Sequence, residues 1–510
     1  MLRSNSGEAV HPLLDIGLVG AGAAAVCLLD ALAQGDLPAG SLTIFEPSSH
    51  AWRGRPYRPD LEVVRVNATP RDMSVRAGDD GHFEDWITAR GVMVGGPGVQ
   101  PDPFSDALFV PRALYGDYLE QSARSALNRL AADGWDVRFV RDRVIGAEPG
   151  AELVLRTATG QRHEVRTLIL GTGAGRPADL YGLAGTEGFV ADPYPVAETL
   201  AQVDPDATVA VIGSGLTAVD VALSLAHRGH RGLIRFHSRD GVLPGVRQRP
   251  VHHQLKHFTT ARFRAAAAHG RRFTLRAVLD LLEQELAEAG ESLSRVAAEM
   301  HAAVTEDPVT RLRRNLDEVD HPSRALRIVQ QAVPEAGPDV FPLLPEAERE
   351  TVLARHHRAL MSLCCPMPPA SAAGLLGLLD TGRLELVPGL RAVQPTLRGF
   401  NLESTHRADQ ADVVVNAVNA RFSRINGEAG SLVGDLARAG VVAPHPRAGI
   451  HVERATSRAV TPTGPQRHIY ALGDLAAGSL FFTFGVQSLA DRAVDIVGAL
   501  ASETLAVLPA

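Results

Sequence analysis

Two stretches of the chain repeat one pattern, in which a short apolar run meets a Gly-x-Gly turn and continues directly into helical spacing. They are DIGLVGAGAAAVCLLDAL at 15–32 and ATVAVIGSGLTAVDVALSL at 207–225. In both, the residue types predict a buried strand, a tight turn and a helix, and a second apolar strand follows at 41–47 and 232–241. A strand–helix–strand unit that occurs twice predicts an α/β fold with two Rossmann-like dinucleotide-binding domains.

The first glycine turn has the residues that a bound pyrophosphate requires. Gly20 allows the tight turn, Gly22 lets the backbone approach the pyrophosphate, and the small Ala25 lets helix and strand pack closely. The phosphates would lie at the helix N-terminus, where free N–H groups and the helix dipole favour an anion. Glu46 ends the following strand, where a carboxylate can accept hydrogen bonds from ribose hydroxyls. This turn is therefore predicted to bind FAD, whose adenosine ribose suits that carboxylate.

The second glycine turn has a different residue at the end of its second strand. Gly213, Gly215 and Ala218 repeat the three positions, but the strand ends in Ser238 and Arg239 instead of an acid. An acid would repel a 2′-phosphate, whereas serine and arginine would bind one. The second turn is therefore predicted to bind NADPH; the alternative is that Arg239 is a solvated turn residue. Two such sites indicate that electrons flow from NADPH to a group held at the first turn.

Two further glycine turns favour FAD at the first site. The apolar strand VRTLILGTG runs into a turn that contains Gly171 and Gly173. Near the C-terminus, the strand in IYALGDLAAG ends at Gly473 and Asp474, which would place a carboxylate near the ribityl and phosphate end of a flavin. A helix predicted to start near Gly485 would direct its N-terminal dipole at negative charge on reduced flavin.

The order of these patterns divides the chain. Residues 1–200 are predicted to form the first part of the FAD-binding domain, residues 201–425 the NADPH-binding domain, and residues 426–510 the second part of the FAD-binding domain. At about 246–360, Glu, Ala, Leu and Arg recur at helical spacing, which predicts a helical insertion in the second domain. This insertion either covers a substrate or packs the domains together.

Composition and single residues exclude several classes of protein. The net charge of −7 gives no general attraction to nucleic acid, no apolar run reaches transmembrane length, and the N-terminus lacks the apolar region of a signal peptide. Lys256 is the only candidate for Schiff-base chemistry. Cys27, Cys364 and Cys365 contain no Cys-x-x-Cys pair, which fits a cytoplasmic protein, and the adjacent pair is interpreted as packing residues. The spacings of the 19 histidines match no zinc pattern, so no metal is predicted.

Together these motifs resemble the flavoproteins with two dinucleotide-binding domains, and within them the bacterial FAD–NAD(P)-binding group related to flavin-dependent N-hydroxylating monooxygenases. The resemblance covers most of the chain and rests on GLVGAGAAA, FEP, GRPYRPDLEVVRVNATPRDMS, FVPRALYGDYL, LILGTG and VIGSGLTAVDVALSLAHRGHRGLIRFHSRDGVLP. It implies that Asn67 and Met73 lie beside the flavin and Arg239 beside the NADPH phosphate.

The chain departs from the pattern of this family at two places. Where the family tends to carry an Arg/His-rich run before a proline, the chain has HHRALMSLCCPMPP, which points to a different substrate or a weakened reaction. Where the family tends to have a Gly turn after a strand, the chain has VVVNAVNARF, which points to an altered hinge between the domains. The histidine of the Baeyer–Villiger fingerprint is also missing from GFVADPYPVAETL, which counts against that subclass.

The expected reaction takes place on the flavin, so the sequence identifies no catalytic side chain. In a flavin monooxygenase the C4a-hydroperoxide transfers the oxygen, and the protein excludes water and holds the substrate. We expect an FAD- and NADPH-dependent monooxygenase of a small soluble molecule that also uses O₂, and the resemblance implies N-hydroxylation of an amine or amino acid. No nucleic-acid or membrane partner is expected, and a homo-oligomer stays open. Two alternatives are a flavin-dependent NAD(P)H reductase or oxidase without oxygen transfer, and a non-catalytic flavoprotein with a scaffolding role.

Overall fold

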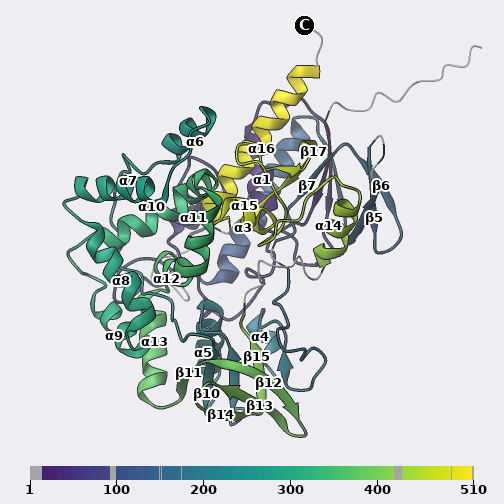
Figure 1. Ribbon diagram of the computed structural model, residues 1–510. Helices are drawn as coiled ribbons and strands as arrows, with labels where there is room; N and C mark the ends of the chain where they lie inside the picture. The colour runs from purple at the N-terminus through teal and green to yellow at the C-terminus, as the bar shows by residue number, and fades with distance from the viewer. Residues whose placement is uncertain are drawn as a thin grey trace, which may run out of the picture.

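The computed structural model describes residues 14–91, 99–148, 150, 152–173, 175–418, 428–483 and 485–507. These residues form two parallel sheets and a group of helices beside them (Figure 1). In that view the first sheet lies at the upper right, the second sheet at the bottom and the helices at the left. The predicted α/β class with two Rossmann-like units is confirmed, because both glycine repeats form a strand, a turn and a helix.

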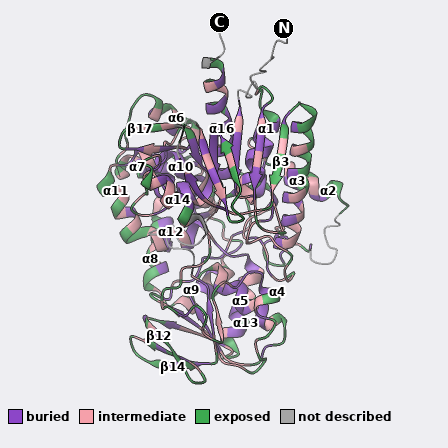
Figure 2. Cartoon of the chain, turned by 90° about the vertical axis from the view of Figure 1, so that its right-hand side faces the viewer, coloured by how far each residue is buried: buried purple, intermediate pink, exposed green. Residues whose placement is uncertain are grey.

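The first sheet contains the first glycine repeat. Its strands are β1 (Asp15–Val19), β2 (Ser41–Phe45), β3 (Asp136–Val140), β7 (Thr167–Leu170), β16 (Arg458–Thr461) and β17 (Gly464–Ala471). Their order is β16-β17-β7-β1-β2-β3, and only β16 and β17 are antiparallel to each other. The apolar runs of β1 and β7 are almost entirely buried (Figure 2), as is typical of parallel strands covered on both faces.

Three long helices pack beside this sheet. They are α1 (Ala23–Gln34), α3 (Arg112–Ala132) and α16 (Val486–Val507). Helix α1 packs against both α3 and α16, so the helix that follows the first glycine turn contacts the last helix of the chain. The C-terminal tail therefore completes the first domain, in both its sheet and its helical layer.

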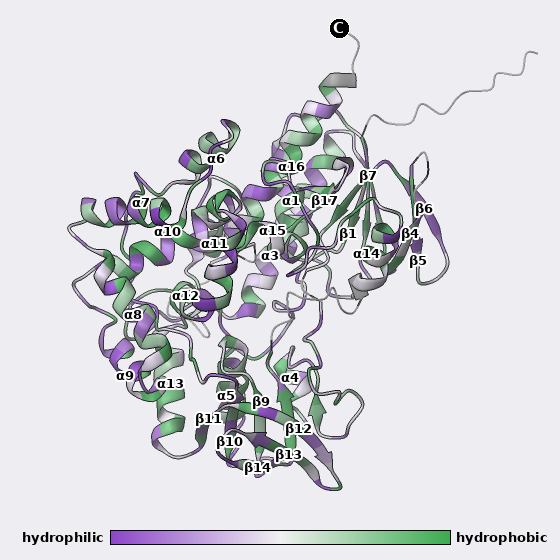
Figure 3. Ribbon diagram, in the orientation of Figure 1, coloured by the Kyte–Doolittle hydropathy of each residue, from purple (hydrophilic) through white to green (hydrophobic). Residues whose placement is uncertain are grey.

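The second sheet contains the second glycine repeat. Its strands are β8 (Phe189–Val190), β9 (Val209–Ile212), β10 (Ile234–Ser238), β11 (Leu384–Pro388) and β15 (Val413–Asn416). They are all parallel, in the order β11-β10-β9-β15-β8. Helices α4 (Val196–Thr199), α5 (Leu216–His227) and α13 (Pro369–Asp380) accompany this sheet. As in the first sheet, the strands are predominantly hydrophobic (Figure 3).

Smaller elements complete the two units. One antiparallel sheet consists of β4 (Val144–Glu148), β5 (Leu153–Thr157) and β6 (Arg162–Val165), and the other of β12 (Leu390–Thr396), β13 (Gly399–Ser404) and β14 (Ala408–Ala411). Helix α14 (Glu428–Arg438) packs against β4, and α2 (His82–Ala89) precedes α3 in the first unit.

The predicted insertion is helical, but it begins later than expected. Its helices are α6 (Thr260–Ala268), α7 (Leu275–Glu288), α8 (Leu293–Thr305), α9 (Pro308–Asp317), α10 (Ala325–Val340), α11 (Glu346–Thr351) and α12 (His357–Cys364). Residues 246–259 contain no helix, and Val246 instead forms a β-bridge with Met367. Pro250 disfavours helix at its own position and at the residue before it, and the first helix begins at the N-cap Thr259, whose Oγ1 accepts the backbone N–H of Arg262 at 3.3 Å.

The helical insertion shares its core with the C-terminal tail. Phe481 and Phe482, which precede α16, are buried in the same hydrophobic cluster as the insertion's helices. The Phe481 ring stacks on Phe341 at a centroid distance of 4.9 Å and an interplanar angle of 26°. A segment inserted in the second domain therefore packs against the first.

Candidate functional site

The residues predicted to hold FAD come together at one end of the first sheet. Gly20 has a φ of 97°, and a Cβ there would lie 2.6 Å from the carbonyl oxygen of Gly171. The turn after β1 and the turn after β7 are therefore in close backbone contact, which only glycine permits. The position of a Cβ at Gly173 lies 4.0 Å from Oδ2 of Asp474. The carboxylate of Asp474 therefore lies beside the turn that follows β7.

Helices α1 and α16 border the same place. A Cβ at Gly473 would lie 3.9 Å from Cβ of Ala24 and 3.4 Å from Cδ2 of Leu489. Ala24 belongs to the first turn of α1, and Leu489 to the first turns of α16, which begins directly after Gly485 as predicted. Ala25 is fully buried, as its predicted packing role requires.

The N-terminus of α1 is open for an anion. Gly22 is its N-cap, and no side chain caps the helix. A Cβ at Gly22 would make only ordinary contact, 3.5 Å from Cα of Gly54. Oε2 and Oε1 of Glu46 accept backbone N–H groups of Ala21 and Ser48, both at 2.9 Å. Each carboxylate oxygen keeps a further acceptor position, so ribose hydroxyls can still bind there.

Buried hydroxyls without partners support a bound group at this place. Oγ1 of Thr172, Oγ1 of Thr483 and Oγ of Ser488 are buried and have no hydrogen-bond partner within the described ranges. Thr172 lies between the glycines of the β7 turn, and the other two lie at the start of α16. Buried polar atoms are normally paired, and a polar cofactor in this cradle would supply the partners. The residues present therefore fit FAD.

Asn67 and Met73 lie on a neighbouring segment. The carbonyl oxygen of Asn67 accepts a hydrogen bond from Nε of Arg247 at 2.8 Å. Met73 is buried in the core of the first domain, and its carbonyl oxygen accepts a hydrogen bond from the Tyr115 hydroxyl at 2.9 Å. No measured contact joins either residue to the described glycine turns, so their place beside the flavin stays a prediction.

The second glycine turn repeats the geometry of the first. Gly213 has a φ of 121°, and a Cβ there would lie 3.0 Å from the carbonyl oxygen of Ala417. Gly215 is the N-cap of α5, no side chain caps that helix, and nothing described lies within 4 Å of where its Cβ would be. Ala218 is fully buried. This helix N-terminus is therefore also open to a phosphate.

The end of β10 presents the predicted phosphate-binding residues. Oγ of Ser238 accepts the backbone N–H of Gly241 at 2.9 Å, and Arg239 is exposed. Asp240 follows directly but forms an ion pair with Arg358 from α12. The acid nearest to Arg239 in the chain is thus neutralised by the helical insertion, which keeps this corner favourable to an anion.

In the segment VVVNAVNARF, which departs from the family pattern, Asn416 forms hydrogen bonds to residues far away in the chain. Its Nδ2 donates to the carbonyl oxygens of Ala178 and Ala191, at 3.2 and 3.3 Å. Ala178 lies in the connection from β7 to β8, which links the two sheets, and Ala191 directly follows β8. Residues 419–422 of this departure lie outside the described residues.

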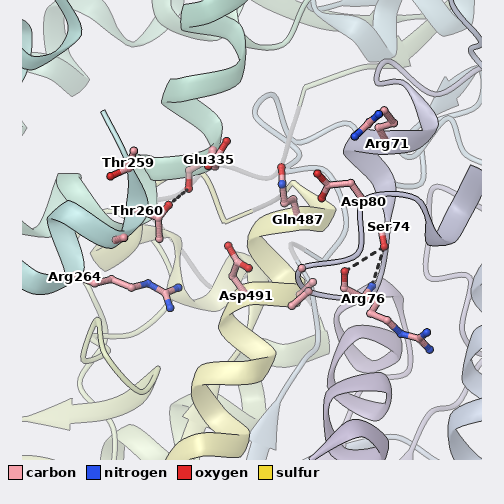
Figure 4. A pocket seen from close by; sticks show the side chains of 14 residues that line it. Arg71, Ser74, Arg76, Asp80, Thr259, Thr260, Arg264, Glu335, Gln487 and Asp491 are labelled. Atoms are coloured by element: carbon pink, nitrogen blue, oxygen red, sulfur yellow. Dashed lines mark hydrogen bonds between the residues drawn. The ribbon is translucent and has the colours of Figure 1, made fainter. Parts of the chain in front are cut away.

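A cavity of about 440 Å³ lies between the first domain and the helical insertion (Figure 4). One wall comes from residues 71–80, one from α6 and α10, and one from the first turns of α16. Its lining consists of Arg71, Ser74, Arg76, Ala77, Gly78, Asp80, Thr259, Thr260, Ala261, Arg264, Glu335, Gln487, Ala490 and Asp491. Because α16 also borders the glycine turns, the cavity and the predicted flavin site share one helix.

The cavity is lined by the carboxyl groups of Asp80, Glu335 and Asp491 and by the guanidinium groups of Arg71, Arg76 and Arg264. Arg76 is engaged outside the cavity by Asp30, with Nη2 and Oδ1 2.9 Å apart, and Arg264 contacts Asp339 at 3.3 Å. Burial raises the pKa of Glu335, and the nearby Asp491 raises it further. Burial also raises the pKa of Asp491, against the opposing effect of Arg264. A cation that entered the cavity would relieve this penalty.

The sequence analysis missed Glu335 and Asp491. Each occurs in an ordinary helical pattern, and only the packing of α10 near α16 brings them to one cavity. Lys256 and Cys365, the other residues that the sequence singled out, have surroundings that suit a structural role. Lys256 is exposed, and its Nζ pairs with Glu288 at 2.9 Å. Burial raises the pKa of Cys365 to about 12, which keeps this thiol protonated at neutral pH.

None of the described helices combines the length and apolar character needed to cross a bilayer. The described residues also contain no group of three histidine, cysteine or acidic side chains arranged to hold a metal ion.

Comparison with known proteins agrees with the fold and with the first site. Residues 17–175 match a family model described as FAD-NAD(P)-binding. No curated protein matches the chain in sequence. The structure is similar to L-lysine 6-monooxygenase from Pseudomonas syringae, with a TM-score of 0.57, 17% identity, and coverage of 96% of this chain and 100% of that one.

Two further solved structures have the same fold. An ornithine N-hydroxylase from a Kutzneria species, solved with reduced FAD, NADP⁺ and L-ornithine, has a TM-score of 0.57 and 14% identity over 96% of this chain and 100% of that one. A cadaverine monooxygenase from Erwinia amylovora, solved with FAD, has a TM-score of 0.58 and 14% identity over 96% and 94%. The chain therefore carries an FAD-NAD(P)-binding domain and has the overall fold of flavin-dependent N-hydroxylating monooxygenases.

Proposed function

We propose that the chain is an FAD- and NADPH-dependent monooxygenase that hydroxylates the nitrogen of a small amine or amino acid. The observation that carries the proposal is the carboxylate-lined cavity, which shares the first turns of α16 with the predicted flavin cradle. An ammonium group can bind Glu335 and Asp491, because burial disfavours the charged forms of both carboxyl groups and a bound cation would stabilise them. The fold is that of enzymes that act on ornithine, lysine and cadaverine, all of which carry amines.

The proposed assignments of the two cradles follow from their geometry. FAD would be held by Gly20, Gly22, Glu46, Gly171, Gly173, Gly473 and Asp474, and NADPH by Gly213, Gly215, Ser238 and Arg239. When bound, FAD supplies the redox and oxygen-activating chemistry. The protein's part is to hold the phosphates at two helix N-termini and to enclose the substrate between the first domain and the helical insertion.

We propose the domain division 1–200, 201–425 and 426–510 on the same grounds. Strand β8 lies within residues 1–200 but pairs with β15 of the second sheet, so the first boundary falls before this strand. The physical crossover between the two units therefore lies between β7 and β8.

Product analysis tests the proposed function. Purified protein is examined for bound flavin, reduced anaerobically with NADPH or NADH, and then given air with ornithine, lysine, cadaverine or no amine. Hydroxylamine product in proportion to NADPH consumed is expected with at least one amine. Peroxide as the only product with every amine would favour the reductase or oxidase alternative, and flavin that NADPH does not reduce would favour the scaffolding alternative.

Replacing Arg239 with alanine is expected to raise the KM for NADPH by about 10- to 100-fold, because a charged hydrogen bond of about 1.5–3 kcal/mol is lost. The KM for NADH, which has no 2′-phosphate, should stay unchanged in the same steady-state assay. Arg231→Ala is the control, because Arg231 is exposed near the opposite end of β10 and pairs with Asp206. Equal effects on both nucleotides would contradict the assignment of Arg239.

Replacing Glu335 with glutamine is expected to raise the KM for the amine by about tenfold or more, because one ionic hydrogen bond is lost. The wild-type KM should itself rise as the pH falls through the raised pKa values of Glu335 and Asp491, since protonation removes the charges that bind the ammonium. Glu283→Gln, on an exposed position of α7, is the control. An unchanged KM in Glu335→Gln would place the amine elsewhere.

A further inference from the structure

A buried ion pair joins the two dinucleotide-binding units. Nη2 of Arg112 lies 2.6 Å from Oδ2 of Asp220, and the two side chains are only 9% and 10% exposed. Arg112 is the first residue of α3 in the first unit, and Asp220 lies in α5 of the second unit. Both residues occur in motifs that carry the family resemblance, FVPRALYGDYL and GSGLTAVDV, but the glycine turns give neither of them a role.

Tyr194 completes this junction from the segment between β8 and α4. Its hydroxyl donates to Oδ2 of Asp220, the same oxygen that Arg112 approaches. The guanidinium groups of Arg112 and Arg55 lie 5.2 and 5.4 Å from the centre of the Tyr194 ring. Arg55 also pairs with Asp192 at 2.8 Å. We call Arg112, Asp220 and Tyr194 the latch.

A second contact restrains the same boundary. Oδ2 and Oδ1 of Asp60 accept the backbone N–H groups of Val196 and Ala197, at 2.9 and 2.8 Å. These donors lie at the start of α4, which packs against α5. The first unit therefore holds the second through the latch and through this backbone contact.

The latch is close to both nucleotide cradles along rigid elements. Asp220 stands about 7.5 Å along α5 from its N-cap, Gly215, at 1.5 Å per residue. Arg112 begins α3, which packs against α1, the helix whose N-cap is Gly22. A shift at the latch would therefore move one cradle relative to the other without changing either cradle.

We propose that Arg112, Asp220 and Tyr194 are positioning residues that fix the NADPH cradle in one orientation relative to the flavin cradle, so that the two cofactors meet without rotation of the domains. This inference rests on the proposed function for its kinetic consequence, but the orientation itself can be measured without any cofactor. Replacing a buried ion pair with apolar residues of similar volume is often neutral for stability, whereas the directional contacts are lost. A double apolar variant thus separates orientation from folding.

Electron–electron spin distances test the latch directly. Spin labels are attached at Ala132→Cys and Leu397→Cys, which are exposed and lie in the first and second units, in a Cys365→Ser background of the full chain. One narrow distance distribution is expected for the parent and for Arg112→Lys, which keeps the charge. A broader or second distribution is expected for Arg112→Met/Asp220→Leu. An unchanged distribution in that variant would overturn the proposal.

The rate of flavin reduction by NADPH tests the kinetic consequence of the latch. At saturating NADPH, Arg112→Met/Asp220→Leu should reduce its flavin about 100-fold more slowly, because a misplacement of about 1 Å has effects of this size. The Kd for NADP⁺ should change by less than about threefold, since the phosphate contacts remain. Arg235→Met/Glu385→Gln, an ion pair within the second sheet at 2.9 Å, is the matched control and should leave both quantities unchanged.

The spin-label distances and the rate of flavin reduction together distinguish a failure of the latch from a failure of the proposed function. A broadened distance distribution together with a parent protein that NADPH cannot reduce would leave the latch standing and overturn the proposed function. A normal reduction rate in the variant despite a broadened distribution would overturn the positioning role. Should the double variant fail to fold, Asp220→Asn combined with Tyr194→Phe weakens the same contacts at nearly constant volume and takes its place in both arms.

Discussion

Replacing Gly22 with valine is expected to yield a folded protein that contains no flavin. The backbone of Gly22 is extended, with a φ of −103° and a ψ of −162°, which valine adopts without strain. Its Cβ would meet only Cα of Gly54, at 3.5 Å, so the protein itself has room for a side chain. A bound pyrophosphate would occupy that room, because the second glycine of such a turn lets the backbone approach it. The measurement is the flavin absorbance of the purified variant, with its circular dichroism.

Gly377→Val provides the control for this prediction. Gly377 lies on an exposed position of α13, and nothing described lies within 4 Å of where its Cβ would be. That variant should keep its flavin, so any loss in Gly22→Val reports on the cradle. A yellow Gly22→Val protein with a normal far-ultraviolet spectrum would show that FAD does not bind at this turn. Gly20 is unsuitable for the test, because a side chain there would collide with the backbone of Gly171.

Replacing Asp339 with alanine is expected to destabilise the fold by about 3 kcal/mol or more, because it removes the buried carboxylate that three arginines share. Asp339 is 1% exposed and contacts Arg454, Arg492 and Arg264, the last two at 3.3 Å. Arg492 is itself only 3% exposed, so water cannot replace the lost carboxylate. These contacts join α10 to α6, to α16 and to the segment before β16. Urea unfolding followed by tryptophan fluorescence measures the loss.

The exposed pair of Arg313 and Asp380 gives the comparison for this prediction. Its closest atoms are 2.6 Å apart, but both side chains are about half exposed. Asp380→Ala should therefore change the free energy of unfolding by less than about 1 kcal/mol. If both variants lost the same stability, the contacts of Asp339 would not hold the helical insertion to the first domain.

The glycine turns could be predicted because their requirements are local. Gly20 and Gly213 have positive φ values and backbone neighbours within 3.0 Å, and such positions exclude every side chain. The strand before each turn and the helix after it are equally local, since apolar runs and helical spacing lie within a few residues. Ser238 and Arg239 at the end of the second strand predicted the NADPH preference of the second cradle, and the resemblance to a known family added the N-hydroxylation.

The cavity and the latch could not be predicted, because their members are far apart in the chain. Glu335 and Asp491 occur in two ordinary amphipathic helices, and no local pattern states that α10 and α16 border one cavity. Arg112 and Asp220 both occur in quoted motifs, yet each motif read separately gives a charged residue in a helix. Only the packing of the two units against each other brings the guanidinium group to the carboxylate.

The boundary of the helical insertion shows the same division between local and distant causes. Helical spacing predicted the helices from α6 onward, and the side chain of Thr259 caps the first of them at residue 260. That these helices pack on Phe481 and Phe482 of the tail does not follow from any spacing, because apolar faces of this kind bury against any suitable surface.

The sequence by itself determined that this protein has two nucleotide cradles on an α/β framework, because turns, strands and helix starts depend on neighbouring residues. The tertiary structure alone decided which carboxylates share a cavity and which arginine holds the second cradle in place. Those contacts join residues that lie more than about a hundred positions apart in the chain, and the burial of apolar surface that brings them together is not directional.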